Sequence, residues 1–418
     1  MGRTIIEKIM LKHRISNDEI APGNIAWISL DNRTARDFGG ANVVGSFEKN
    51  YEESTVNDAS KTFFNFDCQV PANTIAYANN QQTCRKFAKK HDMNVFDVDA
   101  GIGSHIVIEK GYALPGTTTV GTDSHLNILG AVGGFGQGMG DTDIAFVFKT
   151  GKTWFEVPHS IKITLKGKPQ FPTTPKDIIL YLIGELGSAG ALGSVVELYG
   201  DIIDEMDLSG RITLSSMGTE MGAIAIIIPP NNKILRYFRN LKDEEIEGVF
   251  ADEDAKYVKE LEFDISKLTP QIAMPPSPDN VKPVNSLERI AVNSVFMGSC
   301  TNGRYEDFLT AAELLGDGRK VAPGVMAKVV PATKEVFEQM MDTGLMNRYF
   351  SAGFIISNQG CGGCAAGQIG MTGHGEVQIS TSNRNFRGKQ GNGDTYLASP
   401  VTAVASALAG YIASPEVR

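Results

Sequence analysis

Residues 286–418 alternate short apolar runs with helix-length segments, and this alternation limits the possible folds more than any other feature of the chain. A helical crossover returns the chain to the same end of a sheet, so the two strands it joins pair in parallel. The pattern predicts an α/β region with a parallel sheet. Its expected strands are Val292–Met297, Met326–Val330 and Gly353–Ser357, and its expected helices are Arg304–Leu315 and Thr333–Thr343.

The rest of the chain suggests two more α/β regions. Residues 1–155 and 156–272 each mix strand-like runs with helical segments, whereas residues 273–285 hold four prolines and have almost no apolar periodicity. We therefore expect three subdomains, 1–155, 156–272 and 286–418, with a linker at 273–285. Other expected elements are strands Ile25–Leu30, Thr62–Val70, Val95–Val98 and Ile161–Leu165, a helix from about Asn73 to His91, and helix Pro175–Leu186 capped by Thr174.

Charge and hydropathy exclude several classes of protein. The 418 residues carry a formal net charge of −9 without clusters of Lys and Arg, which argues against nucleic-acid binding and against anionic membrane surfaces. No segment approaches the roughly 18 apolar residues of a membrane span. The apolar face of Thr4–His13 is interrupted by Glu7 and Lys8, so this segment is not a signal peptide. We expect a soluble, cytoplasmic protein.

Five cysteines are an odd number for a disulfide framework, and metal binding or reactivity is the better interpretation. Cys300 follows one expected strand, and Cys361 and Cys364 follow another. Ligands bind outside the carboxyl ends of strands in open parallel sheets, so the three thiols should meet at one edge. Glycines around them let the backbone approach closely and donate N–H groups to sulfide.

Three thiolates suggest an iron–sulfur cluster with one open position. A [4Fe–4S] cluster that transfers electrons usually takes four cysteines, whereas three leave one iron free to act as a Lewis acid on a substrate oxygen. The alternatives are a structural zinc site or buried, unreactive thiols. A Cys-x-x-Cys pair alone would favour zinc, but the chain has no second pair of that kind and no His pair to complete a tetrahedral set. We therefore predict a cluster.

Several motifs of the sequence, including those around the three cysteines, resemble motifs of a known family. Five motifs, spread over nearly the whole chain, match the aconitase/isopropylmalate-isomerase family in chain order. They are residues 120–125 (VGTDSH), 217–223 (MGTEMGA), 298–307 (GSCTNGRYED), 361–364 (CGGC) and 382–386 (SNRNF). The resemblance implies three α/β/α subdomains around a cluster-binding cleft. The first would carry the Asp-Cys and Asp-Ser-His motifs, the second Glu220, and the third the cysteines.

The resemblance also implies roles for individual residues. Cys300, Cys361 and Cys364 would hold a [4Fe–4S] cluster with one iron that has no cysteine ligand. The expected catalytic residues are Asp67, His105, Asp123, His125 and Glu220, with the histidines, Asp123 and Glu220 around the metal-bound hydroxyl or water. Substrate carboxylates would be bound by Ser124, Arg384 and Lys389, and Asn383 would lie against the cluster. Dehydration beside a carboxylate needs such fixed cations and proton donors, because negative charge develops there.

Four positions depart from the family pattern. Cys68 stands where a histidine usually follows the aspartate and helps to protonate the departing hydroxyl, and Lys389 replaces a second arginine. Lysine keeps the charge but lacks the bidentate fork. Arg36 replaces a glutamine or histidine and adds a cation, and Ser216 replaces an asparagine. A bolder hypothesis makes Cys68 a fourth ligand of the open iron in some states.

The expected function is the reversible dehydration of a small 2-hydroxy di- or tricarboxylate, with 3-isopropylmalate as the leading substrate. Homoaconitate and the substituted malates dimethylmalate and citramalate are the alternatives. In a different class, a non-catalytic iron–sulfur sensor or RNA-binding relative is the rival, although the acidic balance argues against RNA. The family's swivelling fourth domain and its Gly-Ser-Ser-Arg segment are not found before Arg418. A separate small subunit is therefore expected to supply the serine base.

Overall fold

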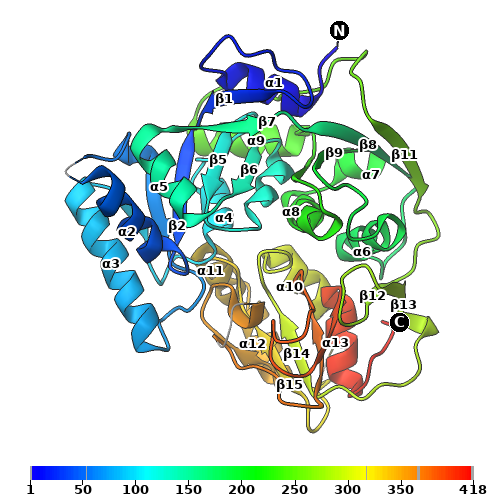
Figure 1. Cartoon of the computed structure of the whole chain (residues 1–418). Helices are drawn as coiled ribbons and strands as arrows, with labels where there is room; N and C mark the ends of the chain where they lie inside the picture. Colours follow the sequence, from blue (N-terminus) through cyan, green and yellow to red (C-terminus); the bar gives the residue numbers. More distant parts are fainter. Residues whose placement is uncertain (1, 53, 317, 365–367, 416–418) are drawn as a thin grey trace.

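The computed structural model describes residues 2–52, 54–316, 318–364 and 368–415. Within these ranges the chain forms three sheets that are wholly or mainly parallel and one two-stranded antiparallel ribbon (Figure 1). Helices lie between and around the sheets. The mixed α/β class expected from the sequence is confirmed.

The first sheet has the strand order β4-β3-β2-β5-β6, and all neighbouring strands are parallel. Its strands are β2 (Asn32–Arg36), β3 (Thr62–Asn65), β4 (Asn94–Phe96), β5 (Thr118–Gly121) and β6 (Phe135–Gly138). The helices of this region are α2 (Gly40–Tyr51), α3 (Ile75–His91), α4 (Gly103–Glu109) and α5 (Asp141–Thr150), and α2 packs against both α3 and α5. Strand β2 ends at Arg36, and residues 67–68 and 122–125 lie just beyond the carboxyl ends of β3 and β5.

The expected strand Ile25–Leu30 exists as β1 (Ile25–Ser29), but it does not join this sheet. It pairs in antiparallel register with β7 (Lys152–Glu156) beside α1 (Ile5–His13). Only two residues separate β1 from β2, which leaves no room for the helical crossover that parallel pairing requires.

The second sheet is also parallel, with the order β10-β9-β8-β11. Its strands are β8 (His159–Lys166), β9 (Ser194–Tyr199), β10 (Ala225–Ile227) and β11 (Lys259–Asp264), and its helices are α6 (Pro175–Leu186), α7 (Asp201–Glu205), α8 (Leu208–Ser216) and α9 (Asn232–Lys242). Helix α6 has the bounds expected from the sequence. Thr174 and Asp177 form a capping box, and Pro175 occupies the first turn, where no N–H is needed.

The third sheet has seven strands in the order β13-β12-β18-β17-β14-β15-β16. The strands from β18 to β16 are parallel, whereas β12 pairs antiparallel with β13 and β18. The strands are β12 (Gln271–Ala273), β13 (Val281–Pro283), β14 (Ser294–Met297), β15 (Met326–Val329), β16 (Ile355–Ile356), β17 (Val377–Ser380) and β18 (Asp394–Ala398); the helices are α10 (Tyr305–Ala312), α11 (Lys334–Asp342), α12 (Leu345–Ala352) and α13 (Pro400–Ala409). The proline-rich residues 273–285 thus contribute β13 to an edge of this sheet.

Buried apolar side chains form one cluster centred on each region, and a further cluster joins all three regions. That cluster includes Phe63, Leu126, Ala332 and the cysteines Cys300 and Cys361. The two cysteines therefore lie where separate parts of the chain meet. Among the described helices, none has both the length and the apolar character needed to cross a membrane.

Candidate functional site

Three cysteines gather at the carboxyl edge of the third sheet. Cys300 lies in the loop after β14, and Cys361 and Cys364 lie in the loop after β16, with β15 between the two strands. The second loop turns tightly, since the Cys364 N–H donates to the Cys361 carbonyl at 3.2 Å. Gly362 in this turn has φ = 57°, a conformation that glycine adopts without strain. A Cβ at this position would come within 2.8 Å of the Val330 side chain.

The side chain of Asn383 joins two of these cysteines. Its Nδ2 donates to Cys300 Sγ at 3.3 Å, and its Oδ1 lies 3.6 Å from Cys364 Sγ. Asn383 is fully buried in the loop after β17. The residue that the sequence placed against the cluster thus contacts the cysteines from a third loop of the same sheet.

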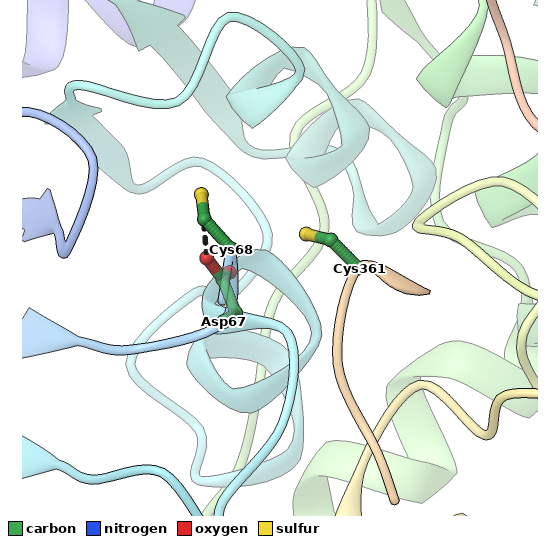
Figure 2. A group of neighbouring side chains, drawn as sticks. All are labelled: Asp67, Cys68 and Cys361. Carbon is green, nitrogen blue, oxygen red and sulfur yellow. Dashed lines mark hydrogen bonds between the residues drawn. The ribbon is translucent and has the colours of Figure 1, made fainter. Parts of the chain in front are cut away.

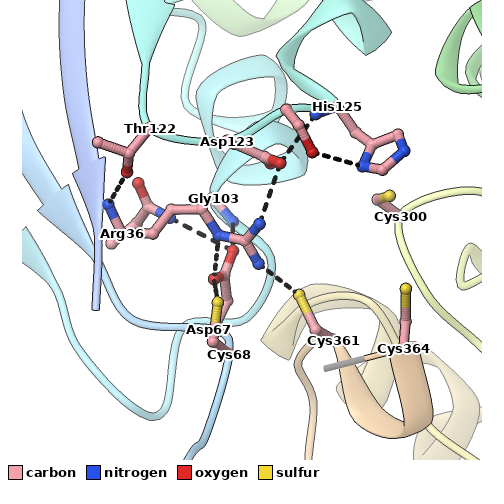
Figure 3. Close-up of polar contacts among 12 residues, drawn as sticks. Arg36, Asp67, Cys68, Gly103, Thr122, Asp123, His125, Cys300, Cys361 and Cys364 are labelled. Carbon is pink, nitrogen blue, oxygen red and sulfur yellow. Dashed lines mark hydrogen bonds and ion pairs between the residues drawn. The ribbon is translucent and has the colours of Figure 1, made fainter. Parts of the chain in front are cut away.

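The cysteines open into a cavity of about 350 Å³. Its wall also contains residues from the first sheet, including Arg36, Cys68, Asp123, Ser124 and His125, together with Lys389 from the third region. Figure 3 shows Arg36, Asp67 and Cys68 on the left, Asp123 and His125 above, and Cys300, Cys361 and Cys364 on the right. The structure therefore brings cysteines, the Asp123 carboxylate, a histidine and two cations to one cavity.

His125 and Glu220 connect the first and second regions. His125 Nε2 lies 3.0 Å from Glu220 Oε1, and the same oxygen accepts a hydrogen bond from Arg384 Nε at 3.0 Å. Asp123 Oδ1 accepts the backbone N–H of His125 at 3.0 Å, and Ser124 Oγ lies 3.4 Å from His125 Nδ1. The His125 ring is thus held between the Ser124 hydroxyl and the Glu220 carboxylate, and these two contacts fix its orientation.

His105 is placed differently from His125. It is fully buried, and its Nε2 lies 2.9 Å from the carbonyl oxygen of Cys300, which can only accept. Burial and the nearby Arg304 lower the pKa of His105 to about 3, so the ring is neutral with its proton on Nε2. Within the described residues, Nδ1 has no hydrogen-bond partner. The contact that the structure shows is with the backbone of a cysteine loop, and His105 does not line the cavity.

Arg36 contacts three groups at once. Its Nε donates to Asp67 Oδ1 at 2.7 Å, its Nη1 to Asp123 Oδ1 at 3.0 Å, and its Nη2 to Cys361 Sγ at 2.7 Å (Figure 3). Burial, only partly offset by Arg36, raises the pKa of Asp67 to about 6. Burial also acts to raise the pKa of Asp123, but Arg36, His125 and Arg384 outweigh it and keep that pKa below its usual value.

Cys68 lies beside Asp67 and Cys361. The two sulfurs and a carboxylate oxygen of Asp67 are all within 4.8 Å of one another (Figure 2). The Cys68 thiol points toward Asp67 Oδ1 at 3.5 Å. Its contact with Cys361, together with burial, raises the pKa of this thiol well above the usual value. A neutral thiol of this kind is a poor proton donor near pH 7.

The donor set fits an iron–sulfur cluster better than a single metal ion. Thiolates around one tetrahedral zinc ion lie about 3.8 Å apart, given Zn–S bonds of about 2.3 Å. Cys300, Cys361 and Cys364 do not form a group whose sulfurs are all within 4.8 Å of one another. They line one cavity from two loops, with Asn383 and Arg36 donating N–H groups to two of the sulfurs. Wider spacing and N–H donors to sulfur suit a multi-iron cluster.

Two residues near the site have contacts that the sequence did not reveal. Lys176, in the first turn of α6, is fully buried and donates from Nζ to the carbonyls of Thr381 at 3.0 Å and Ser382 at 2.6 Å. It thereby holds the loop that carries Asn383 and Arg384. Ser216 Oγ lies 3.1 Å from Thr301 Oγ1, next to the Cys300 loop. A lysine at a helix start gives no sequence signal that separates this role from ordinary surface exposure.

Known proteins resemble this chain over nearly its whole length. The model of the aconitase family (aconitate hydratase) matches residues 7–289 and 282–410. The chain is 41% identical to the probable methanogen homoaconitase large subunit of Methanothermobacter thermautotrophicus, over 95% of this chain and 94% of the relative. It is 40% identical to 3-isopropylmalate dehydratase large subunit 1 of Methanopyrus kandleri, over 100% and 99%.

A bacterial relative and a solved structure extend the comparison. The chain is 39% identical to the homoaconitase large subunit of Thermus thermophilus, over 100% of this chain and 98% of the relative. The crystal structure of Thermococcus kodakaraensis aconitase X in its holo-form covers 85% of this chain and 84% of its own, with a TM-score of 0.53 and 11% sequence identity. At that identity the likeness concerns the fold alone.

Proposed function

Because this chain belongs to the aconitase family and is a hydro-lyase, we propose that it is the large subunit of a 3-isopropylmalate dehydratase-type enzyme. The reaction is the reversible dehydration of a small 2-hydroxy dicarboxylate or tricarboxylate. One observation carries the proposal: three cysteines share a cavity with the Asp123-Ser124-His125 segment and the cations Arg36 and Lys389. Relatives of both isopropylmalate and homoaconitate type cover almost the whole chain.

Membership of the family implies a [4Fe–4S] cluster, and the three cysteines are the residues proposed to hold it. Three thiolate ligands leave one iron without a cysteine, and when bound the cluster supplies Lewis-acid chemistry to a substrate oxygen. The fit rests on the sulfur donors in the cavity wall and on the N–H groups that point at them.

Substrate carboxylates are proposed to bind Ser124, Arg384 and Lys389. The protein as a whole carries a net charge of −9, so an anion needs a local concentration of cations. Lys389 and Ser124 line the cavity. Arg384 donates a hydrogen bond to the carboxylate of Glu220. These groups offer positive charge where dehydration builds negative charge next to a carboxylate.

Proton transfer is assigned to the carboxylates and histidines of the first and second regions. A proton can be shared between His125 Nε2 and Glu220 Oε1, which lie within hydrogen-bond distance. Asp123 accepts the backbone N–H of His125 and so fixes its position. Asp67, with a pKa raised to about 6 by burial, can also exchange a proton near neutral pH. His105 has a positioning role, because its Nε2 donates to the backbone carbonyl of Cys300.

A separate small subunit is proposed to complete the site with a serine base. The relatives are named large subunits, which implies a partner of that kind. Two large apolar side chains near the cavity are exposed: Phe38, which lines it and is 70% exposed, and Phe386, two residues after Arg384 and 51% exposed. Exposed apolar residues beside a cavity are typical of a surface that another protein covers.

Homoaconitate is the second candidate substrate, because relatives of that name match this chain at 41% and 39% identity. The test is to co-purify the small subunit, reconstitute the complex anaerobically with iron and sulfide, and assay 3-isopropylmalate, homoaconitate, dimethylmalate and citramalate in parallel. We expect the highest kcat/KM with 3-isopropylmalate. A preference for homoaconitate would reassign the substrate, and a loaded complex inactive on all four would remove the enzyme proposal.

A further inference from the structure

Arg36 is a buried cation at the centre of the site, and none of the family roles assigned above belongs to it. It is the last residue of β2, and its backbone N–H donates to Thr122 Oγ1 at 2.9 Å, which fixes the start of the side chain. The side chain is only 14% exposed. From there the guanidinium reaches Asp67, Asp123 and Cys361, three groups from three different segments (Figure 3).

The contact with sulfur distinguishes Arg36 from the other cations around the cavity. Arg384 donates a hydrogen bond to Glu220. Lys389 lines the cavity, and its positive charge acts on Cys364. Across the described segments, Arg36 is the cationic side chain that donates a hydrogen bond to a cysteine sulfur, at 2.7 Å from Nη2 to Sγ. Cys361 is one of the three residues proposed to hold the cluster.

We propose that Arg36 is a positioning residue that ties Asp67 and Asp123 to the Cys361 sulfur and donates an N–H···S hydrogen bond to this cluster ligand. The inference rests on the cluster of the proposed function. The planar guanidinium suits the task because its N–H groups point in fixed, divergent directions. Each of the three nitrogens serves a different partner: Nε donates to Asp67, Nη1 to Asp123 and Nη2 to the Cys361 sulfur.

The proposal has a consequence that a purely structural role does not have. Hydrogen bonds to ligand sulfurs and nearby positive charge stabilise the reduced, more negative state of an iron–sulfur cluster, so they raise its reduction potential. Arg36 supplies both effects from a buried position, where charge is poorly screened. Removing it should therefore shift the midpoint potential to more negative values, even where the cluster still binds in full.

The experiment uses the anaerobically reconstituted chain with its small subunit. Wild type, Arg36→Gln and Arg36→Lys are compared by iron content and by EPR at controlled potential. Glutamine keeps a polar side chain but removes the charge, and lysine keeps the charge but lacks the planar group of donors. Lys389→Gln is the matched control, because it removes one positive charge from the same cavity without removing the hydrogen bond to Cys361.

We expect the most negative midpoint potential for Arg36→Gln, an intermediate value for Arg36→Lys, and a smaller shift for Lys389→Gln. An unchanged potential in a fully loaded Arg36→Gln variant would overturn the inference, as would an equal or larger shift in Lys389→Gln. If Arg36→Gln does not fold, as judged by circular dichroism, Arg36→Lys decides, and a potential equal to wild type rejects the role. Wild type that binds no iron would instead reject the cluster, and this inference with it.

Discussion

His125 and Glu220 lie 95 residues apart in the chain, yet their side chains meet at 3.0 Å, Nε2 to Oε1, with both largely buried. The same carboxylate oxygen accepts from Arg384. One acidic group thus connects a proposed proton carrier with a proposed substrate-binding cation. The three regions of the chain contribute one residue each to this contact, so its geometry depends on how they pack.

Replacing Glu220 with glutamine tests that connection. The amide keeps the size of the side chain but removes the negative charge that orients His125 and balances Arg384. Loss of one proton-transfer group costs about 100-fold or more, so kcat/KM of the loaded two-subunit enzyme should fall by at least that factor. Iron content should not change. Glu185→Gln, at an exposed position on α6, is the control and should match wild type, and a Glu220→Gln enzyme of normal activity would contradict the assignment.

Cys300→Ser tests the cluster ligands. A serine hydroxyl is a weak ligand for iron, so the variant should lose most of its iron after reconstitution. Cys84→Ser provides the control, because Cys84 is fully buried in α3, in the apolar core of the first region. It should retain iron like wild type. Equal iron binding in Cys300→Ser and wild type, measured by metal analysis, would remove Cys300 from the ligand set.

Cys68→Ala distinguishes two roles for the cysteine that replaces the family's histidine. The thiol has a pKa raised well above its usual value, so it does not serve as the proton donor near pH 7. We expect turnover within about threefold of wild type, because a lost proton donor would cost about 100-fold or more. Iron content should also be unchanged, since three other cysteines are the proposed ligands. A 100-fold loss of turnover, or loss of iron, would show that Cys68 takes part directly.

Lys176→Met tests the buried lysine that holds the loop of Asn383 and Arg384. The substitution leaves the carbonyls of Thr381 and Ser382 without this donor, which costs about 1–3 kcal/mol for each buried unpaired group. Denaturation of the apo-protein should show a lower free energy of unfolding. A Lys176→Met variant with the same free energy of unfolding as wild type at pH 8 would contradict the prediction, because the two carbonyls would then lose nothing with the amine.

The same lysine predicts a pH dependence. Burial lowers the pKa of Lys176 from 10.5 to about 7, so between these values the unfolded chain binds a proton that the folded chain does not. Stability from this group therefore rises with pH across that window. The free energy of unfolding of wild type, relative to Lys176→Met, should increase from pH 7 to pH 10. A difference that stays constant or falls would contradict the shifted pKa.

Local signals explain which parts of the fold could be predicted from sequence. Helix α6 was expected at Pro175–Leu186 and is found there, because its cap and first-turn proline act within a few residues. The strand expected at Gly353–Ser357 is only Ile355–Ile356, because pairing with β15 at the sheet edge sets its length. Similarly, β1 was visible in the sequence, but its antiparallel partner β7 lies more than 100 residues away.

In the candidate site, too, the features set by local sequence could be predicted, whereas the contacts between distant segments could not. The meeting of Cys300, Cys361 and Cys364 at one sheet edge followed from their position after parallel strands. The sequence also marked Arg36 as an added cation. Its contacts with Asp67, Asp123 and Cys361, and those of Lys176 with the loop after β17, depend on packing between distant segments. No periodicity or local motif encodes such contacts.

The most direct test of the central claim is EPR spectroscopy of the wild-type chain, reconstituted anaerobically with iron and sulfide and then mildly oxidised. A cluster held by three cysteines should contain about four irons per chain when reduced, and it should give a three-iron signal as the iron without a cysteine ligand is lost. That result would support an open iron available to substrate. A chain that binds no iron, or that binds zinc equally well with and without Cys300, would contradict the account.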